Sequence, residues 1–307
     1  MHDPVCIKTF ETGALREKRR TAEALLDNCI LCPRKCRVKR SSGKLGVCRT
    51  GTEAVVSAFD AHFGEEAPLV GSGGSGTIFF SYCNLLCSFC QNHGISHGGQ
   101  GERVSPDQLA WMMLDLQRQG CHNINWVTPS HVVPQILAAL EIAIPQGLAL
   151  PLVYNTGGYD RVDTLKLLEG VVDIYMPDLK FFHAGTARLA GVPEDYFAVA
   201  MEAVVEMHRQ VGDLVVDRLG LARRGLLVRH LVLPENLAGT KEIMAFLAEK
   251  VSSETYVNIM AQYRPCGPAA GIPSLSRSVI VDEYEKALQI AAKQGITRLD
   301  TRRPRFF

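Results

Sequence analysis

The chain has 307 residues, of which 47% are hydrophobic and 21% charged, a composition typical of a soluble globular protein with one large core or two modest ones. Lysine and arginine number 33 against 32 aspartates and glutamates, so the formal net charge is +1. This balance excludes a global attraction to nucleic acid or to an anionic membrane. Residues 1–20 are too polar for a signal peptide, and no apolar run is long enough to cross a bilayer. We therefore expect a cytoplasmic protein.

Ten cysteines are present, and seven of them fall into two tight clusters. Disulfides are rare in a reducing cytosol, so clustered cysteines indicate a metal site. Residues 1–60 are rich in cysteine and arginine, and we expect them to form a small metal-bound lobe. Residues 61–307 are expected to form the second domain.

The N-terminal cluster consists of Cys29, Cys32, Cys36 and Cys48, with the spacing C-x2-C-x3-C-x11-C. Four thiolates suit either a closed tetrahedral zinc site or a second [4Fe–4S] cluster, and the sequence leaves both open. Arg34 lies within the cluster and could stabilise a negatively charged centre. A structural role is expected, because a lobe this short benefits from a bound metal.

Apolar strands alternate with helices from about residue 75 onward. Strands are predicted at 77–81, 122–128, 150–154, 172–176, 226–233 and 255–260. The first helix is predicted to begin after the N-cap Ser105 and to end before Gly120, and further helices are predicted at 132–142, 161–168, within 186–211, at 240–251 and at 282–294. This alternation predicts an α/β fold with a parallel sheet and right-handed crossovers. We expect a partial (β/α)6 TIM-like barrel whose chemistry lies at the C-terminal ends of the strands.

Polar residues and glycines follow the predicted strands where each one ends. They include Ser130 after the second strand, Asn155 and Gly157 after the third, Asp178 and Lys180 after the fourth, and Tyr263 after the sixth. Because these ends meet at one edge of a parallel sheet, we expect them to line one cavity together with the second cysteine cluster.

That second cluster, Cys83, Cys87 and Cys90, follows the first predicted strand with the spacing C-x3-C-x2-C. Three thiolates can hold three irons of a [4Fe–4S] cluster and leave the fourth iron open for a chelating ligand. Phe89, directly before the third cysteine, would shield such a cluster from water. The alternative is a buried helical stripe of small residues, but the segment follows a strand directly and lacks helix-capping residues.

The loop with its flanks, 83–92, resembles the signature of the radical S-adenosylmethionine (SAM) superfamily, and within it the pyruvate formate-lyase activating enzyme group. The segments 154–157 and 177–180 also resemble that group. The N-terminal cluster is similar to that of an uncharacterised branch of activase-like proteins. The resemblance implies that a [4Fe–4S] cluster on Cys83, Cys87 and Cys90 cleaves SAM reductively to a 5′-deoxyadenosyl radical, which abstracts hydrogen.

The resemblance also implies several SAM-binding residues. Asn155 and Gly157 match the family's Asn-Gly loop, and Asp178 and Lys180 match its Asp-x-Lys segment. Lys180 would pair with the SAM carboxylate; the alternative is that it pairs only with Asp178.

Two family features are missing from this chain. The Gly-Gly-Glu motif that contacts the SAM amino group is replaced by residues 128–131, where Ser130 is expected to take over. The family's histidine after the sixth strand is not matched, and Tyr263 there is assigned to cofactor contact, substrate contact or radical relay.

Four other charged or polar residues have less specific expectations. Glu65 and Glu66 are expected to be exposed carboxylates; the alternative is that they face the mouth of the barrel. Arg229 and His230 lie in the fifth predicted strand, and one of the two is expected to be a satisfied polar residue of the interior.

We expect an oxidoreductase, with a glycyl radical enzyme as its protein substrate and flavodoxin or ferredoxin as its one-electron donor. A radical SAM enzyme that acts on a small molecule or RNA fits the same motifs. A two-cluster electron-transfer protein or a zinc-bearing binding module is the alternative from another class. The open iron argues against the carrier, because carriers supply four thiolates per cluster. The zinc module would explain residues 29–48 only.

Overall fold

The computed structural model describes residues 3–302, and it has a mixed α/β fold built on one nine-stranded sheet. The strands follow the order β3-β1-β2-β4-β5-β6-β8-β7, and β9 pairs with β8. Their bounds are β1 Ala54–His62, β2 Ser75–Phe80, β3 Glu102–Val104, β4 Ile124–Val127, β5 Leu152–Thr156, β6 Ile174–Leu179, β7 Val215–Val216, β8 Ala222–Leu231 and β9 Tyr256–Met260.

The six strands β2, β4, β5, β6, β8 and β9 run parallel and are neighbours in chain order. They are the six strands that the sequence predicts, so the α/β class and the parallel sheet are confirmed. Consecutive parallel neighbours joined by right-handed crossovers put all the connecting helices on one face of a sheet. Within residues 3–302, β9 pairs with β8 but with none of β1, β2 and β3. A partial barrel therefore stays a prediction.

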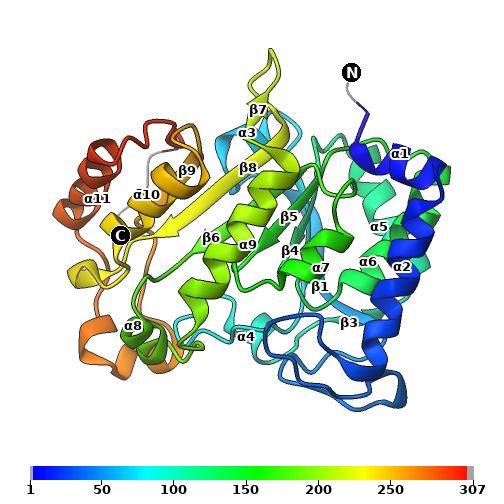
Figure 1. Cartoon of the computed structure of the whole chain (residues 1–307), viewed down its shortest axis with the longest axis horizontal. Helices are drawn as coiled ribbons and strands as arrows, with labels where there is room; N and C mark the ends of the chain where they lie inside the picture. The colour runs from blue at the N-terminus through cyan, green and yellow to red at the C-terminus, as the bar shows by residue number, and fades with distance from the viewer. Residues whose placement is uncertain (1–2, 303–307) are drawn as a thin grey trace.

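The helices cover the outer face of this sheet (Figure 1). Their bounds are α1 Val5–Glu11, α2 Ala14–Ala24, α3 Ala67–Val70, α4 His93–Ser96, α5 Pro106–Arg118, α6 Val133–Ala143, α7 Val162–Leu167, α8 Ala184–Leu189, α9 Tyr196–Val211, α10 Thr240–Phe246 and α11 Val281–Lys293. Helix α5 packs on β2 and β4, α9 packs on β6 and β8, and α11 packs on β9. The capping box predicted for α5 is present, since the Ser105 side chain accepts from the N–H of Gln108.

Three antiparallel strands were not predicted. Strand β1 pairs with β2 on one side and with β3 on the other, and β7 pairs with β8. Residue 60 lies inside β1, so the predicted domain boundary crosses this strand. Helices α1 and α2 contribute Cys6, Leu15 and Ala22 to the main hydrophobic core. The division into 1–60 and 61–307 stays a prediction, and residues 303–307 of its second part lie outside the described residues.

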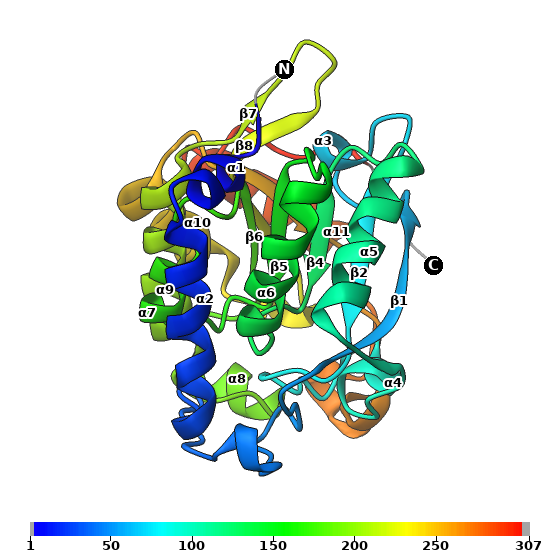
Figure 2. The same ribbon diagram turned by 90° about the vertical axis from the view of Figure 1, so that its right-hand side faces the viewer.

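One end of the sheet collects the segments that carry the candidate chemistry. Figures 1 and 2 both place the blue segment after α2, helices α4 and α8 and the orange segment before α11 along the lower edge of the molecule. Among the described residues, no helix combines the length and the apolar character that crossing a membrane requires.

Candidate functional site

The second cysteine cluster lies in the loop that follows β2. Two residues of this loop, Tyr82 and Leu86, have left-handed backbone conformations with φ of 68° and 61°. A turn closes the loop, because the Cys90 N–H donates to the Cys87 carbonyl at 3.1 Å. Left-handed conformations are uncommon for residues other than glycine and concentrate at functional sites. They bend this short loop, which does not form a helix, so its cysteines do not follow a helical stripe.

The three thiols influence one another electrostatically. Burial raises the pKa of Cys87 to about 12, Lys180 opposes this rise, and Cys83 and Cys90 add to it. The pKa of Cys83 is also raised, first by burial. Lys180 therefore lies close to Cys83 and Cys87 and favours their thiolate forms.

Two donors already reach sulfur in this loop. The Leu85 N–H donates to Cys83 Sγ at 3.3 Å, and the Ser96 hydroxyl donates to Cys90 Sγ at 3.1 Å. Among residues 3–302, no three His, Cys, Asp or Glu side chains meet in a position to hold a single metal ion. A cluster takes one thiolate on each of several irons. The three thiols of this loop fit the donor set of an iron–sulfur cluster.

An ionic network lies at the ends of β5, β6 and β8. Asp178 accepts from Lys180 Nζ and, at 2.7 Å, from Arg229 Nε. Arg229 also donates to Asn155 Oδ1 at 2.7 Å. Burial would raise the pKa of Asp178, but Arg229 and Lys180 together hold it below its usual value. The structure thus brings Asn155, Asp178 and Lys180 together, and it shows the alternative pairing of Lys180 with Asp178.

Glu65 and Glu66 extend this network and are buried, with 8% and 3% exposure, so the expectation of exposed carboxylates is wrong. Glu65 lies 3.9 Å from Arg229 Nη1, and Glu66 accepts from Asn258 Nδ2 at 2.9 Å. Burial and the neighbouring Glu66 raise the pKa of Glu65 to about 8, while Arg229 opposes this rise. The carboxylates are buried because β8 and β9 present a cation and an amide to them.

The neighbouring His230 is a buried residue whose ring nitrogens both form hydrogen bonds, as the sequence suggested for one of Arg229 and His230. Its ring nitrogens contact the Leu179 carbonyl at 2.8 Å and the Thr240 hydroxyl at 2.9 Å. Arg229 points into the ionic network instead. The predicted site residues did not include Arg229, Glu65, Glu66 or Asn258, although an arginine within the mainly apolar run 226–233 was a signal.

Gly157 and Gly158 allow the loop after β5 to approach its neighbours closely. A Cβ on Gly157 would lie 2.6 Å from Leu85 Cδ1 of the cysteine loop and 3.9 Å from Lys180 Cε. Gly158 has φ of +82°, and a Cβ there would lie 2.3 Å from the Asp178 carbonyl oxygen. These glycines bring the loop after β5, the cysteine loop and the end of β6 together.

The hydroxyl of Ser130 forms a hydrogen bond with that of Thr156 at 3.1 Å, and Thr156 donates to Asp160. Ser130 is 3% exposed, at the end of β4. Its hydroxyl therefore takes part in the buried polar network at the end of β5.

Phe89 and Tyr263 form an aromatic cover over the cysteine loop. Their rings meet edge to face with centroids 5.4 Å apart, and Phe89 meets Phe181 in the same way at 5.9 Å. The Tyr263 hydroxyl donates to the Leu275 carbonyl at 2.7 Å, and burial raises its pKa to about 12. Tyr263 therefore presents its ring, not its hydroxyl, to Phe89.

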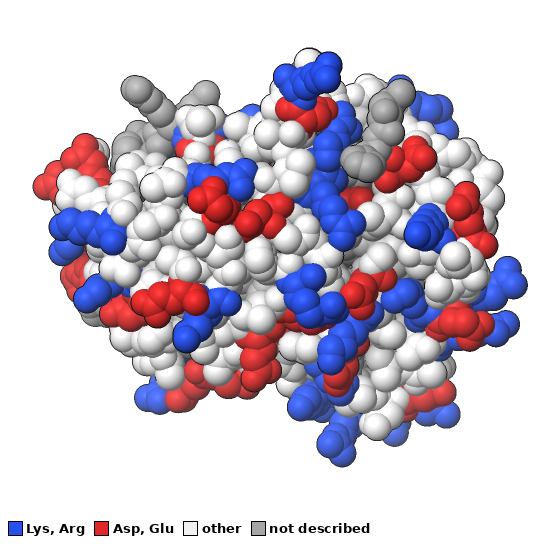
Figure 3. Space-filling view, turned by 45° about the horizontal axis from the view of Figure 1, so that its top comes forward, with Lys and Arg blue, Asp and Glu red and all other residues white. Residues whose placement is uncertain are grey.

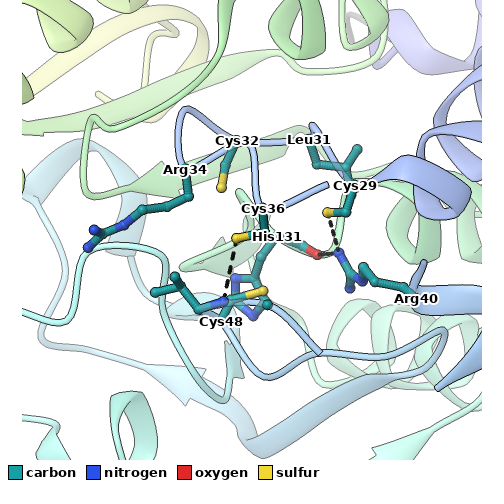
Figure 4. A pocket seen from close by; sticks show the side chains of 10 residues that line it. Cys29, Leu31, Cys32, Arg34, Cys36, Arg40, Cys48 and His131 are labelled. Atoms are coloured by element: carbon teal, nitrogen blue, oxygen red, sulfur yellow. Dashed lines mark hydrogen bonds between the residues drawn. The ribbon is translucent and has the colours of Figure 1, made fainter. Parts of the chain in front are cut away.

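The N-terminal cysteines line a separate small pocket (Figure 4). Cys29, Cys32 and Cys48 are buried, and Cys36 is half-buried. Burial raises the pKa of Cys32 to about 12, and the charges of the other three cysteines add to this rise. The structure thus brings all four cysteines together in one place.

Comparison with known proteins gives a clear sequence relative. No protein-family model matches the chain. The uncharacterized protein MJ0674 of Methanocaldococcus jannaschii is 31% identical to it over 283 residues, which cover 90% of this chain and 77% of that protein. The crystal structure of HydG, a maturase of the [FeFe]-hydrogenase, is similar with a TM-score of 0.48 and 15% identity over 73% of this chain. The chain spans 50% of the length of HydG.

Proposed function

The chain belongs to the same family as the uncharacterized protein MJ0674 of Methanocaldococcus jannaschii, and from its own cysteine loop we propose that it is a radical SAM enzyme. The observation that carries the proposal is the grouping of three buried or half-buried thiols, spaced C-x3-C-x2-C, beside Lys180 at the end of a parallel strand. In parallel α/β sheets this edge is where ligands bind.

Cys83, Cys87 and Cys90 would hold a [4Fe–4S] cluster, and its remaining iron would be free to bind the amino and carboxylate groups of SAM. When bound, the reduced cluster would supply the electron that cleaves SAM to methionine and a 5′-deoxyadenosyl radical. Two neighbouring donors support this assignment, since the Leu85 N–H favours the thiolate form of Cys83 and the Ser96 hydroxyl donates to Cys90 Sγ.

The chain's own residues bind and orient SAM. Lys180 is the cation that attracts the carboxylate of SAM. Asp178 accepts a hydrogen bond from the ammonium group of Lys180 and so holds it at the end of β6. Arg229 fixes both Asp178 and the amide of Asn155, which faces the same edge. Gly157 lets Leu85 of the cysteine loop pack against the loop after β5, so that both loops lie at the SAM site. Ser130 takes the place of the family's acidic contact to the SAM amino group.

The aromatic cover excludes water from the cysteine loop. Phe89 is 5% exposed and packs edge to face against both Phe181 and Tyr263. A radical formed beside it would thereby be shielded from solvent. The ring of Tyr263, which completes this cover, is therefore the part that would contact SAM or substrate.

The parallel strands in chain order support a partial (β/α)6 barrel around this site. The one-electron donor to the cluster would be flavodoxin or ferredoxin. The activase-like flanks of the cysteine loop favour a glycyl radical enzyme as substrate. Figure 3 shows lysine and arginine interspersed with aspartate and glutamate over the described part of one face. The formal net charge of +1 favours a protein substrate over RNA, which is bound through basic surfaces.

The test is an assay for 5′-deoxyadenosine. Protein reconstituted anaerobically with iron and sulfide is mixed with SAM and dithionite, and the products are separated by chromatography. We expect equal amounts of 5′-deoxyadenosine and methionine from the wild type and none from C87A. C121A is the matched control, because Cys121 is also buried but lies apart from both clusters. Equal SAM cleavage by C87A and the wild type would overturn the proposal.

A further inference from the structure

The pocket of the N-terminal cysteines contains a buried cation without a counter-charge. Arg40 is 1% exposed, and none of the ion pairs among residues 3–302 includes it. Its guanidinium donates to the carbonyls of Gly51 and His131, both at 3.0 Å, and lies 3.9 Å from Cys29 Sγ. Its Nη2 has no hydrogen-bond partner. An unpaired buried charge is costly, so this pocket is built for an anionic group.

A second buried polar atom in the same pocket also lacks a partner. His131 is 1% exposed, and its Nε2 lies 3.0 Å from the Ser81 carbonyl, so this nitrogen carries the proton and donates. The other ring nitrogen, Nδ1, has no hydrogen-bond partner. Figure 4 shows the ring between the cysteine side chains. Buried polar groups are almost always satisfied, so both orphan atoms indicate a group that belongs in the pocket.

The four thiols supply the donors for such a group. Cys29, Cys32, Cys36 and Cys48 line the pocket together with Arg40 and His131. Gly46 is needed beside them, because a Cβ there would lie 2.8 Å from Cys36 Sγ. The Val47 N–H donates to the same sulfur at 3.5 Å. Four thiolates outweigh the positive charge of a zinc ion or of a [4Fe–4S] core, so either centre would neutralise Arg40.

A zinc ion and a [4Fe–4S] cluster require different arrangements of the four thiols. A structural zinc needs all four sulfurs at about 2.3 Å from one point. Within the described part of the chain, no three ligand-type side chains meet in this way, although the four thiols share one pocket. A [4Fe–4S] cluster instead takes one thiolate at each of four corners. We propose that Cys29, Cys32, Cys36 and Cys48 hold a second iron–sulfur cluster, closed by four thiolates, with Arg40 as its counter-cation.

The same segment is joined directly to the loop of the first cluster. Arg34, between Cys32 and Cys36, donates to the carbonyls of Asn84 and Leu85 at 2.8 and 3.1 Å. His131 holds the Ser81 carbonyl at the start of that loop. The second cluster is thus built into the support of the first, and its loss should loosen residues 81–87.

The test counts metal in variants that keep one site each. The wild type, C83S/C87S/C90S and C29S/C32S/C36S/C48S are reconstituted anaerobically, and iron, acid-labile sulfide and zinc are measured per chain, with C121S as the control. We expect about eight irons in the wild type and in C121S and about four in each multiple variant. If the fourfold variant does not fold, the triple variant decides alone, because its about four irons can lie only on the N-terminal cysteines. A triple variant that contains zinc, or neither metal, overturns the proposal.

A charge variant tests the role of Arg40 in the triple-variant background. R40M keeps the unbranched aliphatic part of the side chain and removes its charge, whereas R40K keeps the charge. We expect R40M to lose iron to a chelator several-fold faster and to have a lower reduction potential, with R40K close to the parent. Equal rates and potentials for R40M and R40K would show that the cation does not act on the cluster. The outcome is independent of SAM cleavage: about four irons in the triple variant with no SAM cleavage by the wild type would support this site and refute only the proposed function.

Discussion

The pairing of Asp178 with two cations predicts a large loss of stability when that carboxylate is neutralised. Asp178 is 7% exposed and accepts from Lys180 and, at 2.7 Å, from Arg229. Two unit charges about 4 Å apart interact by about 4 kcal/mol at an effective dielectric constant of 20. D178N would leave two half-buried cations, Lys180 and Arg229, without this carboxylate, and breaking a buried ion pair typically costs about 3–5 kcal/mol. We expect the free energy of unfolding to fall by that amount at neutral pH.

The assay is urea unfolding of the iron-free protein, followed by circular dichroism at several pH values. Because the pKa of Asp178 is held below its usual value, its contribution is present above the unfolded pKa of about 3.9 and is lost as pH falls through the folded pKa. The difference between D178N and the wild type should therefore shrink in acid.

The matched control is D163N, since Asp163 pairs with Arg161 on the surface and its side chain is 65% exposed. This variant should lose about 0–1 kcal/mol. A D178N variant as stable as D163N would refute the reasoning from the buried network.

Three further predictions follow from single contacts. The pKa of Glu65 is raised to about 8. The contribution of Glu65 to the free energy of unfolding is therefore complete below pH of about 4.5 and is lost as pH rises through about 8. The free energy of unfolding of E65Q should lack this fall with rising pH. G158A should cost about 2–3 kcal/mol in thermal unfolding, because its Cβ would meet the Asp178 carbonyl, whereas G185A, with open space, should be nearly neutral. R34M should speed amide hydrogen exchange in residues 83–90, because two carbonyl contacts of the cysteine loop are lost.

Each of these has a result that contradicts it. Parallel pH curves for E65Q and the wild type would show that Glu65 titrates normally. Equal losses in the two glycine variants would exclude the steric contact at Gly158. Unchanged exchange in R34M, with faster exchange elsewhere, would show that Arg34 does not support the loop.

The parallel part of the sheet was predictable because its signals are local. Apolar runs of strand length, such as the one that became β6, alternate with helices that carry their own caps, such as Ser105 before α5. β1 was missed because it lies in a segment rich in charge and cysteine, and only alternate residues of its first part are buried. Its position at the sheet edge depends on pairing with β2 and β3, which the sequence does not state.

The site was predictable where spacing or strand ends carry the information. The cysteine spacing led to Cys83, Cys87 and Cys90, and the strand-end rule led to Asn155, Asp178 and their neighbours. The burial of Glu65 and Glu66 was not predictable, because their partners Arg229 and Asn258 lie on strands far along the chain. His131 and Arg40 were missed for the same reason: their unpartnered atoms are visible only once the pocket is assembled.

The central claim is that three thiolates hold a cluster whose fourth iron binds SAM. Electron–nuclear double resonance on the reduced protein, mixed with SAM that carries ¹⁷O in its carboxylate, tests this contact at the iron itself. We expect an ¹⁷O hyperfine coupling in the wild type that is absent from C83S/C87S/C90S. A reduced cluster in the wild type that shows no coupling to labelled SAM, and whose spectrum SAM leaves unchanged, would show that SAM does not bind to the iron.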